Sequence, residues 1–203
     1  MEKKKTSIKI MISAAALLLI AAAVTLILTV GKAEKPVSAA GPTVIIETPP
    51  KIPTESREPF FLDVSITSMG EALYPAASMS ISFDSERLEF LGIAQGNVPV
   101  LSDTAEGMLP EWGVNIERSN EIGQINTMYL DITNGKNAFS GKLLSEDKNV
   151  LLRLEFRLRE SASAGDIYEL TADDICLAAS DSTQSLSTAQ GTLGAVNGRI
   201  VVG

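Results

Sequence analysis

The side chains that most often carry out enzyme chemistry are scarce in this sequence. The 203 residues contain no histidine and a single cysteine, Cys176. Without histidine, a serine or cysteine nucleophile lacks its usual base, and the commonest metal ligand is missing. Two carboxylates such as Asp84 and Glu89 are the minimum for glycoside hydrolysis, but no sequence feature places them in a cleft. We therefore expect a protein that is not an enzyme, in which Cys176 is a small buried core residue.

Two acidic segments are candidates for cation binding, and neither has the required ligand pattern. Residues 131–142 (DITNGKNAFSGK) begin with Asp131, as a calcium-binding EF-hand loop begins, but Thr133 and Lys142 stand at positions that require ligands. The acidic pair at 173–174 is more typical of a solvated turn than of a surface cation site. We expect neither a bound metal nor a cofactor.

Charge is distributed unevenly along the chain. The net charge is −8, but residues 1–36 contain six lysines against two glutamates, so the remainder carries −12. Binding to nucleic acid requires clustered lysine and arginine side chains that neutralise phosphates. The acidic remainder therefore argues against nucleic acid as a partner.

An apolar run near the N-terminus predicts a membrane anchor. Residues 10–30 contain no charge and no proline, and as a helix they would span roughly 31 Å, which matches the hydrocarbon core of a bilayer. The lysines in residues 1–9 predict that this basic N-terminus is cytoplasmic and that everything after the anchor lies outside the cell. The sequence thus predicts a single-pass protein of a bacterial-type cell membrane.

A cleaved signal peptide is the alternative for the same run, with the small residues VSA at 37–39 as the cleavage motif, and the domain would then be secreted. We favour the anchor because the run is longer than the usual signal-peptide core and because charged residues separate it from that motif. Residues 31–42 (GKAEKPVSAAGP) are small, polar and interrupted by proline, which is typical of a linker. The folded domain is expected at 43–203.

Within 43–203 the hydrophobic residues recur with a period of two, which predicts β-strands with one buried face. The clearest case is 151–160 (LLRLEFRLRE), where apolar residues alternate with charged ones. The other predicted strands lie at 43–48, 60–67, 79–83, 112–117, 123–133, 166–180 and 198–203. Eight or nine short strands, with no sustained helical period, predict an all-β sandwich or barrel.

Four segments, taken in order, resemble cohesin domains, the extracellular receptors for dockerin modules in cellulosome-type assemblies. They are MSISFDSERLEFLGI at 79–93, INTMYLDITNG at 125–135, LLRLEFRLRESASAGDIYEL at 151–170 and GAVNGRIVVG at 194–203. The resemblance covers 43–203 and departs from the family at Ser85, where proline is usual. It implies an antiparallel jelly-roll sandwich of about nine strands. One flat sheet face would then dock a dockerin-bearing protein, whose dockerin is itself calcium-dependent, at the cell surface.

The predicted strand phases select candidate residues for such a face. If Met79, Ile81 and Phe83 enter the core, the serines at 78, 80 and 82 point outward. By the resemblance, positions 78 and 80 align with the strand that contacts the partner in cohesins. On 123–133 the same phasing leaves a methionine and a leucine outside, which is typical of an interface core. On 112–117 it buries Trp112, Val114 and Ile116 and leaves polar rim residues outside. The candidate partner-binding residues are Ser78, Ser80, Asn115, Glu117, Met128 and Leu130.

Two other interpretations of this face remain open. The serine row suits an idle solvated sheet as well as it suits a docking surface. The loop at 133–143 (TNGKNAFSGKL) could fold over Met128 and Leu130 and bury them. The residue pattern alone does not choose among these interpretations.

Direct sugar binding is the alternative function, because carbohydrate-binding modules of related jelly-roll fold share part of the pattern. A module of that kind, acting in polysaccharide binding or degradation, needs exposed aromatic rings, but the strand phases turn most of the rings inward. The strand phases do not assign five aromatic rings to the core or to the surface, namely Phe61, Tyr74, Phe90, Phe139 and Tyr168. A structural or adhesive ectodomain is the third alternative.

Overall fold

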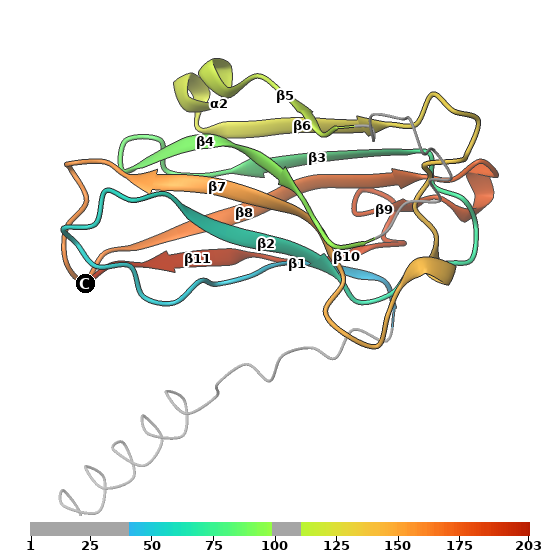
Figure 1. Cartoon of the computed structure of the whole chain (residues 1–203), viewed down its shortest axis with the longest axis horizontal. Coiled ribbons are helices and arrows are strands. Elements are labelled where there is room, and N and C mark those ends of the chain that lie inside the picture. Colours follow the sequence, from blue (N-terminus) through green and yellow to red (C-terminus); the bar gives the residue numbers. More distant parts are fainter. Residues whose placement is uncertain (1–40, 99–110) are drawn as a thin grey trace, which may run out of the picture. The chain divides into compact units, whose positions relative to one another are not determined.

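Two β-sheets form the domain in the computed structural model, which describes residues 41–98 and 111–203 (Figure 1). The first sheet has the strand order β10-β1-β2-β7-β4, and the second has the order β11-β8-β3-β6-β5, with β9 paired to β8. The first sheet consists of β1 (Thr43–Ile46), β2 (Phe60–Ile66), β4 (Leu88–Gln95), β7 (Val150–Leu158) and β10 (Gly194–Val196). The second consists of β3 (Ala76–Ser82), β5 (Gly113–Val114), β6 (Gln124–Leu130), β8 (Ile167–Ala178), β9 (Leu186–Ser187) and β11 (Gly198–Val201). Short helical segments are α2 (Ile116–Ile122), η1 (Gly141–Leu143) and η2 (Ser182–Gln184).

The strand pairing is antiparallel except where β1 lies parallel to β10. β10 and β11 are consecutive in the chain, separated by Asn197, and belong to different sheets. The chain therefore passes from one sheet to the other at this corner. The predicted fold class, an all-β sandwich, agrees with this arrangement.

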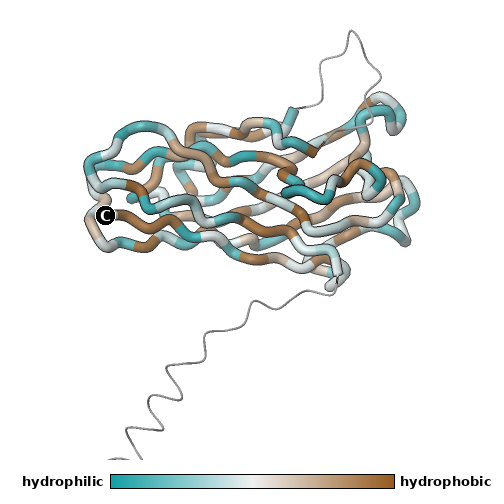
Figure 2. The backbone as a smooth tube through the Cα atoms, turned by 60° about the horizontal axis from the view of Figure 1, so that its bottom comes forward, coloured by the Kyte–Doolittle hydropathy of each residue, from teal (hydrophilic) through white to brown (hydrophobic). Residues whose placement is uncertain are grey.

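Two groups of aromatic rings fill the space between the sheets. Near the start of β6, Phe83 and Phe90 pack against Phe156. The distance between ring centroids is 5.3 Å for Phe83 and Phe156 and 5.5 Å for Phe90 and Phe156. Near the end of β6, Tyr129 lies 5.5 Å from Trp112 and 4.6 Å from Phe139, measured between centroids. Aliphatic residues from alternate positions of the strands complete the core, and Figure 2 shows the resulting alternation of hydrophobic and hydrophilic residues along the strands.

The predicted N-terminal elements, namely the basic residues 1–9 and the anchor at 10–30, lie outside the described residues, as does most of the linker at 31–42. In the part of the chain that the structure describes, no helix is both long enough and apolar enough to span a bilayer.

The strand predicted at 112–117 is shorter in the structure. Only Gly113–Val114 form a strand (β5), and helix α2 begins at Ile116. The side chain of Asn115 caps the helix by accepting a hydrogen bond from the backbone N–H of Arg118 at 2.9 Å. At the other end Gly123 has φ 68°, a left-handed conformation that ends helices and suits glycine. Ile116, predicted to be buried, is 41% exposed on the first turn.

Helix α2 covers the open edge of β4 through one side-chain amide. The backbone N–H of Phe90 donates to Asn120 Oδ1 at 2.9 Å, and Asn120 Nδ2 donates to the carbonyl oxygen of Phe90 at 2.8 Å. Asn120 therefore satisfies both main-chain groups of a residue whose own side chain is fully buried. An unpaired buried main-chain group would cost free energy comparable to a lost hydrogen bond.

Replacing this amide should destabilise the domain. We expect Asn120→Ala to lower the free energy of unfolding by about 1–3 kcal/mol, because it leaves a peptide N–H and a carbonyl without partners. Urea unfolding followed by circular dichroism measures the change. Glu121→Gln on the same helix is the control, since its ion pair with Arg118 is exposed and worth at most about 1 kcal/mol. Equal effects of the two substitutions would show that the amide does not hold the edge.

Candidate functional site

The outward-pointing residues of β8, β3 and β6 form one continuous surface, which we call the β3 face. It consists of Ser78, Ser80, Ser82, Gln124, Asn126, Met128, Leu130, Asp173, Asp174 and Cys176. Register places Ser78 opposite Met128 on one side and opposite Cys176 on the other. The structure therefore brings together four of the six residues selected from the sequence, namely Ser78, Ser80, Met128 and Leu130.

One part of the β3 face is apolar and open to solvent. Met128 is 57% exposed and Leu130 is 50% exposed, and Ile132, just beyond the end of β6, is 85% exposed. The loop that follows β6 thus leaves Met128 and Leu130 uncovered, contrary to one of the sequence-based alternatives. Large apolar side chains in contact with water on a regular sheet mark a surface suited to a partner.

The middle of the β3 face is polar and already ordered by hydrogen bonds. Ser80 Oγ donates to Asn126 Oδ1 at 2.9 Å, and Asn126 Nδ2 donates to Gln124 Oε1 at 3.4 Å. Ser82 Oγ donates to the carboxylate of Asp173. Side chains that are held in place before binding lose little conformational entropy when a partner arrives.

A β-bulge gives the β8 side of the β3 face its negative charge. Ser80 lies opposite Asp174 and Ile81 lies opposite Ala172, so Asp173 is the extra residue in β8. The bulge leaves both adjacent carboxylates exposed on the strand. The acidic pair thus lies within a β-strand and not in the solvated turn that the sequence suggested.

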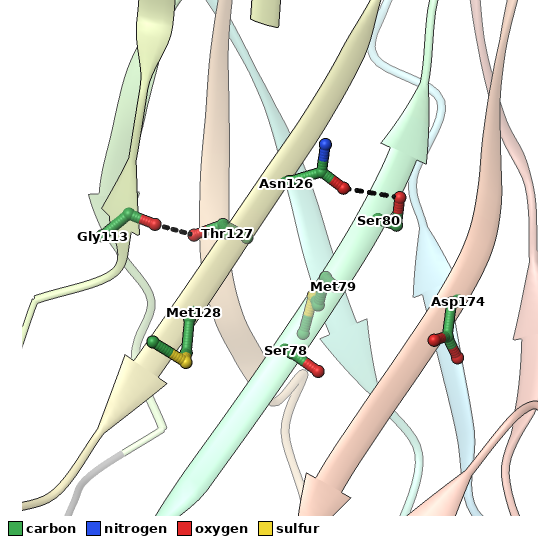
Figure 3. A pocket seen from close by; sticks show the side chains of 8 residues that line it. All are labelled: Ser78, Met79, Ser80, Gly113, Asn126, Thr127, Met128 and Asp174. Carbon is green, nitrogen blue, oxygen red and sulfur yellow. Dashed lines mark hydrogen bonds between the residues drawn. The ribbon is translucent and has the colours of Figure 1, made fainter. Parts of the chain in front are cut away.

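A shallow depression of about 290 Å³ lies at the centre of the β3 face. Figure 3 shows Met128 on one side of Ser78 and Asp174 on the other, with the hydrogen-bonded pair Ser80 and Asn126 beside them. The depression therefore has an apolar wall, an acidic wall and a floor of small hydroxyl groups. That combination suits a partner that inserts one aliphatic and one basic or donor-rich side chain.

Cys176 lies on the β3 face, which corrects its predicted place in the core. The residue is half-buried between its neighbours on β3 and β9. Burial raises the pKa of the thiol, and the nearby charge of Asp174 raises it further. The thiol therefore remains protonated at neutral pH and is a weak nucleophile.

Asn115 and Glu117 belong to the beginning of α2 and not to a strand of the β3 face. Asn115 caps the helix, so its side-chain oxygen is already engaged. Glu117 is the acidic residue of the first turn, where it interacts favourably with the helix dipole. Their predicted place on a strand beside the β3 face is therefore wrong.

The carboxylates considered for catalysis or metal binding have other partners. Asp84 accepts hydrogen bonds from the backbone N–H groups of Glu86 and Arg87 at 3.0 and 3.2 Å. Glu89 pairs with Arg157 through two hydrogen bonds of 3.1 and 2.7 Å. Within 41–98 and 111–203, no three acidic or cysteine side chains gather in a way that could hold a metal ion.

Comparison with known proteins identifies the architecture. No protein-family model matches the chain, and no curated protein matches it. Among solved structures, the sixth cohesin of scaffoldin B from Acetivibrio cellulolyticus, in complex with the Cel5 dockerin, superposes with a TM-score of 0.58 at 17% identity, covering 80% of this chain and 99% of that one. The cohesin of the Coh-OlpA–Doc918 complex from Clostridium thermocellum gives 0.59 at 14% identity, with 80% and 99% covered. The domain has the cohesin fold.

A cohesin from outside the cellulosome has the same architecture. The non-cellulosomal cohesin of the archaeon Archaeoglobus fulgidus superposes with a TM-score of 0.53 at 18% identity, covering 81% of this chain and 92% of that one. The resemblance to cohesins expected from the order of four sequence segments is therefore confirmed at the level of the fold. At these identities the similarity concerns the backbone and not the residues of the β3 face.

The end of β6 in this cohesin fold is fixed by a loop that closes on Asp131. Its carboxylate accepts hydrogen bonds from the backbone N–H groups of Thr133 at 2.7 Å and Gly135 at 2.8 Å. The loop turns at Asn134, which has φ 62°, a conformation that asparagine adopts more readily than most residues. This closed loop follows directly on Leu130 at the edge of the β3 face.

The environment of Asp131 favours its ionised form. Burial by itself raises the pKa of this carboxyl, but the hydrogen bonds from Thr133, Asn137 and Gly135 together lower it below its ordinary value of 3.8. A carboxyl whose pKa is lowered on folding stabilises the folded state above the unfolded pKa, and this contribution is lost as the pH falls through the folded pKa.

Replacing Asp131 should therefore have a pH-dependent effect on stability. We expect Asp131→Asn to lower the free energy of unfolding by about 1–3 kcal/mol at pH 7, because an amide NH₂ would face backbone N–H donors. The difference from wild type should shrink as the pH falls below about 3.8, because the carboxyl is then protonated in the unfolded chain and, at still lower pH, in the folded domain as well. Urea unfolding at pH 7 and pH 3 measures both values. A difference independent of pH would contradict the assigned role, and Asp147→Asn in an exposed loop is the control.

Proposed function

We propose that this protein is a cohesin-type receptor whose β3 face docks a dockerin-bearing protein. The observation that carries the proposal is the pair Met128 and Leu130, exposed on a central strand beside an ordered polar row. The solved cohesins that superpose on this domain include structures in complex with dockerins, which supports a protein as the partner. Docking of this kind needs no bond chemistry and agrees with the expectation that the chain is not an enzyme.

The polarity of the β3 face specifies the chemistry of the partner. An aliphatic side chain of the dockerin would cover Met128 and Leu130, because burying them removes apolar surface from water. A lysine, an arginine or a hydroxyl donor would lie against Asp173 and Asp174. Complementary charge of this kind speeds association and selects among partners more than it adds to affinity.

The place of docking follows from the predicted N-terminal anchor. With residues 10–30 in the membrane and the linker at 31–42 fully extended, the domain would stay within about 40 Å of the bilayer. The receptor would then hold its partner close to the outer surface of the cell. If the same run is a cleaved signal peptide, the receptor is secreted with its partner.

Direct sugar binding at the β3 face receives no support from the aromatic residues. Tyr74, Phe90, Phe139 and Tyr168, left unassigned by the sequence, are all buried in the core. Tyr74 and Tyr168 therefore cannot serve as a stacking platform. Phe61 is exposed, but it belongs to β2 in the other sheet.

Binding should depend on calcium and on Met128. We expect the full chain to bind dockerin-containing proteins of the same organism when calcium is present and to release them in EDTA, since the dockerin fold requires the ion. Met128→Asp should weaken binding by at least about 30-fold, because it places a charge in the buried centre of the interface. Biolayer interferometry with immobilised dockerins measures both effects.

Matched variants separate loss of the interface from loss of the fold. Met128→Leu keeps an aliphatic side chain and should bind nearly as well as wild type. Phe61→Ala on the opposite sheet should leave dockerin binding unchanged. Unaltered binding by a folded Met128→Asp variant would show that another surface docks the partner, and no binding to any dockerin of the organism would favour a structural or adhesive role.

A further inference from the structure

Phe61 is an aromatic ring without a structural role in the core. The chain has one tryptophan, three tyrosines and six phenylalanines, all within the described residues, and Phe61 alone among them is exposed, at 46%. Its neighbour Phe60 packs against Phe156, so β2 already supplies the ring that the core needs at this end. An exposed phenylalanine ring on the outer face of a sheet is a stacking surface for a ligand.

A hollow of about 250 Å³ adjoins Phe61 on the outer side of the first sheet. The segment 49–50, two consecutive prolines, lines part of the hollow, and its charged lining residues are Glu47, Asp63 and Lys148. Proline rings are rigid, so the hollow keeps its shape without a ligand. Its volume lies just below the range of about 300–1,000 Å³ typical of sites for drug-sized ligands, which suits a single ring-sized unit better than a protein segment.

The charged groups of this hollow are held in place by one another. Lys148 Nζ lies 2.8 Å from Glu47 Oε2 and 2.7 Å from Asp63 Oδ2. Ser65 Oγ donates to Glu47 Oε1 at 2.9 Å, and Arg153 Nε lies 3.2 Å from Asp63 Oδ1. The two carboxylates retain free lone pairs as acceptors, and two positive charges balance their negative charges. Glu155, which register places opposite Phe61, adds a further negative charge. The site is therefore rich in hydrogen-bonding groups held by one another and has no net positive charge.

From these features we propose that Phe61 and its hollow bind a neutral glycan, with one pyranose ring stacked on the phenyl face. A pyranose with equatorial hydroxyl groups presents a flat face of C–H bonds to an aromatic ring and directs its hydroxyls sideways. Lys148 would donate to one hydroxyl oxygen, and Glu47 and Asp63 would accept from others. Because the site has no net positive charge and the body of the chain carries −12, an uncharged sugar fits better than a uronate.

This site is separate from the one proposed for the dockerin. Phe61 belongs to β2 in the first sheet, and the β3 face belongs to the second sheet. The two outer faces of a sandwich point away from each other, so a glycan and a protein partner can be bound at once. The glycan site would thus add a second, weaker attachment to the surroundings of the cell.

The test uses the full chain and a soluble β-1,4-glucan fragment. Because residues 10–30 are apolar, the protein is kept in a detergent without a sugar headgroup. Cellohexaose is the probe, since all hydroxyls of its β-linked glucose rings are equatorial. We expect saturation-transfer NMR and calorimetric titration to show binding by wild type. Phe61→Ala should weaken it at least about tenfold, the value of one aromatic stacking contact, whereas Phe61→Tyr keeps the ring and retains binding.

The controls distinguish this site from other surfaces. Ile167→Ala removes another exposed apolar side chain and should leave cellohexaose binding unchanged. Met128→Asp, which should abolish docking at the β3 face, should also leave it unchanged, so the two proposals can fail independently. No binding of cellohexaose by wild type at millimolar concentration, or equal binding by wild type and a folded Phe61→Ala variant, would overturn the proposal. Self-association in sedimentation experiments that Phe61→Ala abolishes would also overturn it, because a second copy would then occupy the hollow.

Discussion

Burial of alternate residues between the two sheets determines which side chains of each strand face the solvent. Met79, Ile81, Ile125 and Tyr129 all point into the core and are essentially inaccessible to solvent. Because successive side chains of a strand point to opposite sides, shifting either strand by one residue would expose these groups. The same packing therefore obliges Met128 and the serines of β3 to face outward. The chemistry of the β3 face is thus set by the positions that the core leaves free.

The outer faces of the two sheets differ in whether their charged side chains form ion pairs. On the first sheet, carboxylates and basic groups pair with each other, as between Arg157 and Glu89 or between Lys148 and Asp63. On the β3 face, Asp173 and Asp174 have hydroxyl and amide neighbours but no basic partner among the ion pairs of the described residues. An unpaired acidic pair attracts a basic partner over a distance of about one Debye length. The first sheet, where most of these charges are paired, suits contacts made at short range.

The strand phases were accessible from the sequence because each strand buries one face, and this leaves a clear period of two. Helix α2 was not, since β5 has only two residues, too few to show a period, and the capping residues Asn115 and Gly123 both fall in segments whose pattern predicts strands. The bulge at Asp173 depends on how β8 pairs with β3, which no local pattern records. Cys176 is small and apolar enough for a core position, but the pairing of β8 with β3 turns it outward, opposite Ser78. Phe61 could have been selected by the phasing of β2, which buries Leu62 and Val64.

The amide of Asn120 has a consequence for the way in which other molecules can be recognised. Many proteins bind extended peptides by accepting them as an additional strand at an open sheet edge, where free main-chain groups supply affinity with little regard to side chains. At β4 those groups of Phe90 are already bonded to Asn120, and α2 lies along the edge. An incoming strand would have to displace the helix before it could pair. Strand addition is thereby disfavoured at this edge of the first sheet, whereas on the flat faces of the sandwich side chains decide which molecules are accepted.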